Sequence, residues 1–186
     1  MRIISGRLKG KSINFIKNSN TRPLKDKVKE NIFNILAHSN LFLTRIKGSN
    51  VLDLYSGIGS FGLECISRGA VSVKFVEKNK EAFKILKGNI SKLSIDNQAR
   101  VIHDNAESFL KNGGIEHYNI FFFDPPFMDK SFIKNLSVIK DKKLFKKKHI
   151  IIIHRERKSK DNFENFIKIL ITKNYGRSKI IFGIFN

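Results

Sequence analysis

A short apolar run that breaks into glycines constrains this chain more than any other stretch. Residues 50–62 read Asn-Val-Leu-Asp-Leu-Tyr-Ser-Gly-Ile-Gly-Ser-Phe-Gly, and an apolar helical pattern follows. This order predicts a buried parallel strand, a tight turn and the first turn of a helix. Glycines in such a turn let the backbone pass close to a ligand, because a Cβ would occupy the ligand's volume. The stretch therefore predicts a nucleotide-type cofactor site.

The position of Asp53 narrows the choice of cofactor. A glycine pattern alone fits NAD, FAD or S-adenosylmethionine, and it also occurs in plain strand–turn–helix units. Asp53 lies at the strand end, before the first glycine, where a carboxylate repels a pyrophosphate and attracts an ammonium group. The methionine part of S-adenosylmethionine carries such a group, so Asp53 favours this cofactor.

The bulk composition suits one domain without a metal site. The chain has 186 residues, 41% of them hydrophobic, and no apolar run reaches the ~18 residues of a membrane span. Residues 1–6 are too short an apolar stretch for a secretion signal, so we predict a cytoplasmic protein. Cys65 is the single cysteine, which excludes an internal disulfide and a cysteine-based metal cluster. We assign neither a metal nor a catalytic role to the histidines, which lack metal-ligand spacing: His38, His103, His117, His149 and His154.

The charge favours a polyanionic partner. The net charge is +20, from 36 basic and 16 acidic residues, and each cation that meets a phosphate releases counterions. An A/T-biased coding sequence would also raise the lysine content, so position matters more than the sum. A second basic cluster runs from Lys140 to Lys160. The first cluster, in residues 1–30, consists of Arg2, Arg7, Lys9, Lys11, Lys17, Arg22, Lys25, Lys27 and Lys29.

The first 49 residues predict an extension before the main fold. Two short strands, 2–6 and 12–16, flank a basic, glycine-containing turn and would form a hairpin. Proline at position 23 restricts the backbone of Arg22 to extended conformations, which limits the directions that its side chain can take. A helix is expected over 25–37, where apolar residues recur at helical spacing, and a mixed connector follows at 38–49.

From residue 50 onward, strand and helix patterns alternate, which predicts a doubly wound α/β sheet. The last two strand patterns are separated by only 174–177, too short for a helical crossover, so they should pair antiparallel. A final antiparallel hairpin is the feature of the seven-stranded methyltransferase sheet. The expected strands are 50–54, 72–77, 100–103, 119–123, 149–154, 167–173 and 178–185. The expected helices are 60–68, 80–93, 106–111 and 131–139.

Polar side chains follow two of the expected parallel strands, at the edge where such sheets bind ligands. Glu77 ends the second strand and can accept both ribose hydroxyls of an adenosine. Asp104 or Asn105, after the third strand, can meet the amino edge of adenine, and the residues leave open which one does so. Capping of the following helix is the alternative role there.

The turn Asp124-Pro125-Pro126-Phe127 is the most specific chemical signal. Pro125 forces Asp124 into an extended conformation, and two successive prolines fix the direction of the turn. An exocyclic amine on a base is a poor nucleophile, because its lone pair is delocalised into the ring. If the Asp124 carboxylate and the Pro125 carbonyl accept its two N–H bonds, the nitrogen becomes more tetrahedral and its lone pair points at the methyl group. Phe127 offers a stacking face to an extruded base, worth ~1–3 kcal/mol. A rigid loop that merely closes a strand is the alternative.

With these residues in view, the chain resembles the class I S-adenosylmethionine methyltransferases, and most closely the RsmD family of bacterial enzymes that methylate guanine N2 in small-subunit ribosomal RNA. The resemblance covers nearly the whole chain, and the amino-terminal Thr-Arg-Pro with the Phe-Asn pair discriminates it from generic methyltransferases. The matching segments are 1–6, 9–10, 20–23, 28–36, 51–62, 67–70, 75–78, 105–106, 124–127 and 173–176.

The resemblance implies a monomer that acts on 16S ribosomal RNA within the 30S particle. It implies cofactor contacts at Asp53, Tyr55, Ser56, Gly57, Gly59, Glu77, Lys78, Asp104, Asn105 and Ala106. Catalysis falls to Asp124, Pro125 and Phe127. The expected RNA contacts are Arg7, Lys9, Lys11, Thr21, Arg22, Pro126 and Phe127.

Two other functions remain open. A DNA adenine-N6 methyltransferase shares the Asp-Pro-Pro-aromatic turn, but little chain is left here for a target-recognition segment. A non-catalytic RNA-binding assembly factor would keep only the fold. We divide the chain into an RNA-binding extension, 1–49, and a methyltransferase domain, 50–186.

Overall fold

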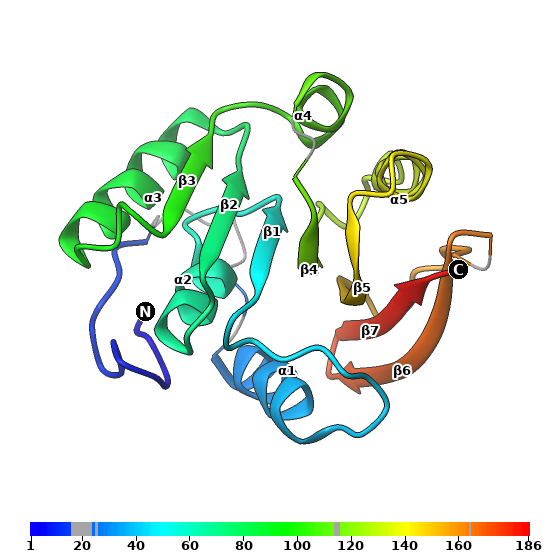
Figure 1. The fold of residues 1–186 in the computed structure, drawn as a ribbon, viewed down its shortest axis with the longest axis horizontal. Coiled ribbons are helices and arrows are strands. Elements are labelled where there is room, and N and C mark those ends of the chain that lie inside the picture. Colours follow the sequence, from blue (N-terminus) through cyan, green and yellow to red (C-terminus); the bar gives the residue numbers. More distant parts are fainter. Residues whose placement is uncertain (16–23, 25, 114–115, 164) are drawn as a thin grey trace.

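The computed structural model describes residues 1–15, 24, 26–113, 116–163 and 165–186, and it consists of one sheet with helices on both faces (Figure 1). The strand order is β3-β2-β1-β4-β5-β7-β6. The strands are β1 (Asn50–Leu54), β2 (Ser72–Val76), β3 (Ala99–Ile102), β4 (Tyr118–Phe123), β5 (Phe145–Glu156), β6 (Ile167–Tyr175) and β7 (Ser178–Phe185). The helices are α1 (Asp26–His38), α2 (Ser60–Ser67), α3 (Lys80–Lys92), α4 (Ala106–Asn112) and α5 (Phe132–Asp141).

The predicted α/β class and the antiparallel end are confirmed. β3, β2, β1, β4 and β5 run parallel, whereas β7 pairs antiparallel with both β5 and β6. β5 begins four residues earlier than the isoleucine run indicated, because Tyr118 also pairs with Phe145. All carboxyl ends of the parallel strands therefore meet at one edge, which also receives the turn between β6 and β7.

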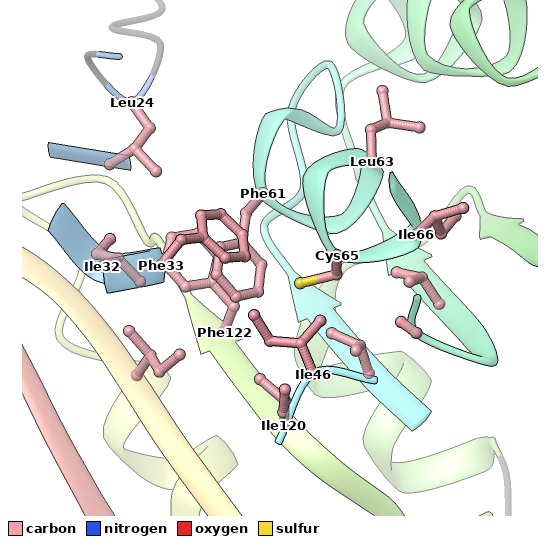
Figure 2. Close-up of a cluster of buried hydrophobic side chains, with 14 of the residues drawn as sticks. Leu24, Ile32, Phe33, Ile46, Phe61, Leu63, Cys65, Ile66, Ile120 and Phe122 are labelled. Carbon is pink, nitrogen blue, oxygen red and sulfur yellow. The ribbon is translucent and has the colours of Figure 1, made fainter. Parts of the chain in front are cut away.

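The strands are apolar without alternation because helices cover both of their faces. Successive side chains point to opposite sides, so Ile150 and Ile152 pack with α1, α2 and α3, whereas Ile151 and Ile153 pack with α4 and α5. On the first of these sides, three phenylalanine rings lie over one another (Figure 2). Phe61 stacks on Phe33 at 5.2 Å and on Phe122 at 4.0 Å, which joins α1 and α2 to β4.

The predicted amino-terminal hairpin was wrong in its extent. In the described residues a short hairpin replaces the two expected strands: Arg2 and Ser12 form an antiparallel bridge, and backbone hydrogen bonds join residues 1–3 to residues 10–13. The backbone N–H groups of Ile4 and Ser5 donate instead to the buried carboxylate of Glu64 in α2, at 2.8 and 2.9 Å. These N–H groups therefore take no part in β-sheet pairing, and their bonds to Glu64 attach the amino-terminal segment to α2.

No helix among the described residues is long and apolar enough to cross a membrane.

Candidate active site

A cavity of about 1180 Å³ opens at the carboxyl ends of the parallel strands. Pockets for single small ligands have volumes of about 300–1000 Å³, so this one can hold two groups side by side. Its β1–β3 end consists of Gly57, Val76, Glu77, Lys78, Asn79, Asp104, Asn105, Ala106 and Glu107. Its β4–β7 end consists of Tyr55, Asp124, Pro125, Pro126, Phe127, Asp129, Ser131, Asn135, His154, Tyr175, Gly176, Arg177 and Ser178.

The glycine turn forms the floor of the β1–β3 end. Gly57 and Gly59 both have positive φ, 54° and 86°, which favours glycine. A Cβ on Gly59 would clash with Leu86 of α3, whereas a Cβ on Gly57 would meet nothing within 4 Å. Gly59 thus lets the turn pack on α3, and Gly57 leaves open space in the cavity.

Asp53 lies behind this turn and does not line the cavity. The carboxylate is 1% exposed, and its Oδ2 accepts a hydrogen bond from the Gly62 N–H at 3.0 Å in the first turn of α2. Burial raises the pKa of Asp53 well above its usual range. Its Oδ1 is buried and has no partner among the described residues. Ser56 lies equally deep and joins the strand ends, because its N–H donates to the Val76 carbonyl at 3.0 Å.

Glu77 is held facing the cavity by two backbone N–H groups. Its Oε2 accepts from Gly57 at 2.7 Å, and its Oε1 accepts from Asn79 at 2.6 Å. Both donors belong to the backbone, so the turn itself, with Gly57 at positive φ, fixes the orientation of the carboxylate. The adjacent Lys78 is exposed at the rim.

Asn105 is the N-cap of α4, with its Oδ1 accepting from the Ser108 N–H at 2.9 Å. The capping role that the sequence left open is therefore present. Asp104 Oδ1 accepts from the Asn105 N–H at 2.7 Å. Both side chains, and Ala106 beside them, still line the cavity.

Asp124 begins a chain of three side chains at the β4–β7 end. His154 Nδ1 lies 2.8 Å from Asp124 Oδ1, and His154 Nε2 lies 2.9 Å from Ser178 Oγ. An ionised carboxylate only accepts, so Nδ1 carries the proton and donates to Asp124. Among the described residues Asp124 Oδ2 has no partner, which leaves it as an acceptor facing the cavity.

A buried arginine fixes the proline turn. Arg155, 1% exposed, donates to the carbonyls of Pro126 and Phe127 at 3.1 and 2.9 Å. Its Nε donates to Asp161 at 2.9 Å, and both side chains of this ion pair are 1% exposed. The guanidinium thus bonds two successive carbonyls of the turn, and the Pro126 carbonyl also accepts from the Asp129 N–H at 2.8 Å. It also leaves the Phe127 ring edge-on to His154, with centroids 5.7 Å apart.

Tyr55 occupies a strained conformation between the two ends. Its φ is 66°, uncommon for a residue with a side chain, and its hydroxyl accepts from Asn135 Nδ2 at 2.8 Å. Burial raises the pKa of the Tyr55 hydroxyl. Asn135 belongs to α5, so this helix orients the Tyr55 side chain, which the sequence predicts to contact a cofactor.

The sequence interpretation missed His154, Arg155 and Ser178. The sequence does carry a signal for His154. This residue directly follows the isoleucine run of β5, at the edge of the sheet where Asp124 follows β4.

The residues predicted to contact RNA lie in two places. Pro126 and Phe127 line the cavity. Arg7, Lys9 and Lys11 belong to the turn at residues 7–11, which lies at the amino ends of the strands, since the Arg7 N–H donates to the carbonyl of Ser67, the last residue of α2, at 2.8 Å. In Figure 1 the amino-terminal segment, in dark blue, lies away from the carboxyl ends of the parallel strands. Thr21 and Arg22 fall outside the described residues.

The strand order, the glycine turn and the cavity at the carboxyl edge define a class I methyltransferase fold. The family model described as "Conserved hypothetical protein 95" matches residues 1–184. Ribosomal RNA small subunit methyltransferase D of Buchnera aphidicola is 35% identical over 173 residues, covering 93% of this chain and 83% of the relative. The putative rRNA methyltransferase YlbH of Bacillus subtilis is 31% identical, covering 84% of this chain and 83% of the relative.

Among solved structures, the putative methyltransferase yhhF of Escherichia coli superposes with a TM-score of 0.82 at 28% identity, covering 98% of this chain and 96% of the other. The chain belongs to the Conserved hypothetical protein 95 family, which is the RsmD family. This membership and the class I fold indicate S-adenosylmethionine as the cofactor.

Proposed function

We propose that this protein transfers a methyl group from S-adenosylmethionine to the exocyclic N2 of a guanine in 16S ribosomal RNA, guanine 966, within the 30S particle. Relatives named as ribosomal RNA methyltransferases support an RNA substrate. The observation that carries the proposal is that Glu77 and Asp124 face one cavity with room for a nucleoside and a base. On this account the protein acts as a monomer in the cytoplasm, during ribosome biogenesis.

The β1–β3 end fits the cofactor. S-adenosylmethionine supplies a methyl group on a positively charged sulfur when it is bound. Gly57 leaves the open space that a nucleoside needs, and the Glu77 carboxylate retains lone pairs for ribose hydroxyls. Asp104 and Asn105 would meet the adenine edge. Asp53 lies behind the glycine turn and not in the cavity, so we assign it the role of holding the Gly62 N–H in the first turn of α2.

The β4–β7 end fits a base amine. Asp124 Oδ2 and the Pro125 carbonyl would accept the two N–H bonds of guanine N2. His154 occupies Asp124 Oδ1, so the carboxylate cannot rotate away from the amine. Arg155 fixes the carbonyls that follow Pro125, and Phe127 provides a face against which the flipped base stacks. Positioning of this kind supplies much of the rate of such a transfer.

We assign residues 50–186 to the methyltransferase domain and residues 1–49 to an RNA-binding extension. Arg7, Lys9 and Lys11 would reach parts of the substrate distant from the target base, because their turn lies at the edge away from the cavity.

A parallel assay with labelled cofactor tests this function. Purified protein is incubated with unmethylated small ribosomal subunits, with protein-free 16S RNA and with plasmid DNA. We expect label in the RNA of the subunits, on guanine N2 after nuclease digestion. Label on adenine N6 in DNA would establish the DNA methyltransferase instead. Label in neither, together with tight binding to the subunits, would favour an assembly factor.

A further inference from the structure

A group of cations borders the β4–β7 end of the cavity. Two segments that carry arginine and lysine lie side by side, because β5 pairs with β7. One follows the end of β5 at Glu156, and the other leads into β7 at Ser178. Glu156 pairs with Ser178, and the Arg157 N–H donates to the Arg177 carbonyl at 2.8 Å. We call this group the corner surface; it consists of Arg157, Lys158, Lys160, Arg177 and Lys179.

The fold itself does not neutralise these charges. Among the described residues, one cation of the corner surface is paired with a carboxylate: Arg177 lies 3.3 Å from Glu156. Asp161 is already committed to the buried Arg155. Lys179 donates one hydrogen bond to the Ser159 carbonyl at 2.7 Å, which leaves its charge without a carboxylate partner in the described part of the chain. Like charges gathered in this way raise the local potential and attract an anion.

The composition of the corner surface points to phosphates. Lysine is common throughout this chain, so lysine by itself indicates little. Arg157 and Arg177, however, are exposed arginines, whose planar guanidinium groups bind phosphate oxygens in pairs.

The corner surface is continuous with the place proposed for the target base. Tyr175, Gly176, Arg177 and Ser178 line the same cavity as Asp124. Ser178 is also bonded to His154, and hence to Asp124. A base that is flipped into the cavity remains covalently attached to its own phosphates, which must then lie at the cavity mouth.

The basic turn at residues 7–11 cannot serve these phosphates. It packs on the last residue of α2, and the Arg7 guanidinium bonds Gln98, which immediately precedes β3. Both contacts lie at the amino ends of the strands. β1 and β2 are five residues long, and at about 3.3 Å per residue they separate this turn from the cavity by roughly 15 Å or more.

We propose that the corner surface binds the single-stranded RNA backbone on either side of the target nucleotide, with Tyr175 available to stack on a neighbouring base. This inference rests on the proposed function, since it uses the entry of a flipped base into the cavity. On this proposal the corner surface, rather than the turn at residues 7–11, makes the main contact with the RNA next to the target nucleotide.

Paired charge removals at the two edges of the sheet test the proposal. The corner variant is Arg157→Ala with Arg177→Ala. The matched control is Lys147→Ala with Lys148→Ala, which removes two exposed cations from the amino end of the same strand. A third protein carries Arg7→Ala with Lys9→Ala. Binding of protein-free 16S RNA is measured over a salt series without cofactor, and transfer to small subunits is measured separately.

For the corner variant we expect the dissociation constant for RNA to rise on the order of tenfold, and the slope of log K against log salt to fall by about one per cation. The KM for small subunits should rise, with affinity for S-adenosylmethionine unchanged. The control should show smaller losses in both measurements. Equal losses in the corner and control variants, or a larger loss in the Arg7/Lys9 variant, would overturn the proposal. Because RNA binding is read without methylation, failure of the proposed function would appear separately, as wild-type protein that binds RNA but transfers no label.

Discussion

The two ends of the cavity fix their carboxylates by different means. At the β1–β3 end, backbone N–H groups of Gly57 and Asn79 hold Glu77. At the β4–β7 end, the side chain of His154 holds Asp124, and that histidine comes from another strand, 30 residues further along the chain.

This difference separates a general feature of the fold from a specific one. A backbone N–H is present at every residue except proline, so the first arrangement needs only the turn and one acid. The second requires particular side chains on β5 and β7. We therefore expect substitutions on β5 to impair the chemistry, and substitutions at the ends of β1 and β2 to impair cofactor binding or folding.

Replacement of Arg155 by alanine should give the largest loss of stability. It leaves Asp161 buried without its partner and frees two carbonyls, so the free energy of unfolding should fall by about 3–5 kcal/mol. Arg177→Ala, which breaks an exposed pair with Glu156, should cost about 0–1 kcal/mol. Urea unfolding of both variants checks this. Similar losses would show that Arg155 does not hold the proline turn.

Replacement of His154 by alanine should lower kcat on the order of 10²-fold, because Asp124 loses the donor that orients it. His154→Asn restores an N–H near the position of Nδ1 and should recover kcat to within about tenfold of wild type. Cofactor affinity should stay unchanged in both variants.

His149→Asn is the matched control for this pair. His149 is an equally buried histidine of β5, but it bonds the Lys146 carbonyl and the Phe185 N–H away from the cavity. Its kcat per folded molecule should equal that of wild type. A His154→Asn variant as slow as His154→Ala would refute the orienting role.

Glu77→Gln should weaken S-adenosylmethionine binding by roughly tenfold, about 1.4 kcal/mol, because the acceptor loses its charge and one of the two oxygens that accept backbone N–H groups becomes an NH2 donor. At saturating cofactor, kcat should be unchanged. Calorimetry measures the affinity and initial rates measure kcat. A change in kcat without a change in affinity would reverse the roles given to the two ends.

Asp53→Asn should have the smallest effect on catalysis, and it should change the pH dependence of stability. Burial raises the pKa of Asp53 in the folded state above its unfolded value, so the folded state binds more protons. This contribution to stability is complete below the unfolded pKa, near 4, and is lost as pH rises through the folded pKa. Within that window the wild-type free energy of unfolding should fall with pH by up to about 1.4 kcal/mol per unit relative to Asp53→Asn. Parallel pH profiles of urea unfolding would contradict the assignment.

Local patterns predicted the fold and the strand ends that border the β1–β3 end, although Asp53, Ser56 and Gly59 do not line the cavity. The glycine turn, Glu77 and Asn105 each lie directly after a strand, so their shared edge followed from parallel topology alone. The carboxyl-terminal hairpin followed from the length of its connection.

Long-range partners could not be predicted in the same way. The N–H groups of Ile4 and Ser5 donate to Glu64, about 60 residues away, and the amino-terminal hairpin is shorter than expected. Asp161 lies in the loop after β5, and nothing local marks it as the partner of a buried arginine. The antiparallel register of β5 and β7 had to be known before Ser178 could be placed beside His154.

The most direct test of the account is mass mapping of N2-methylguanosine in 16S RNA from cells without this gene, complemented with either wild-type protein or Asp124→Ala. We predict that one modified guanine is lost on deletion and restored by the wild type. It should not be restored by Asp124→Ala, although that purified variant still folds and binds S-adenosylmethionine within about tenfold of wild type. Full restoration by Asp124→Ala, or an unchanged modification pattern after deletion, would contradict the central claim that Asp124 holds the accepting amine.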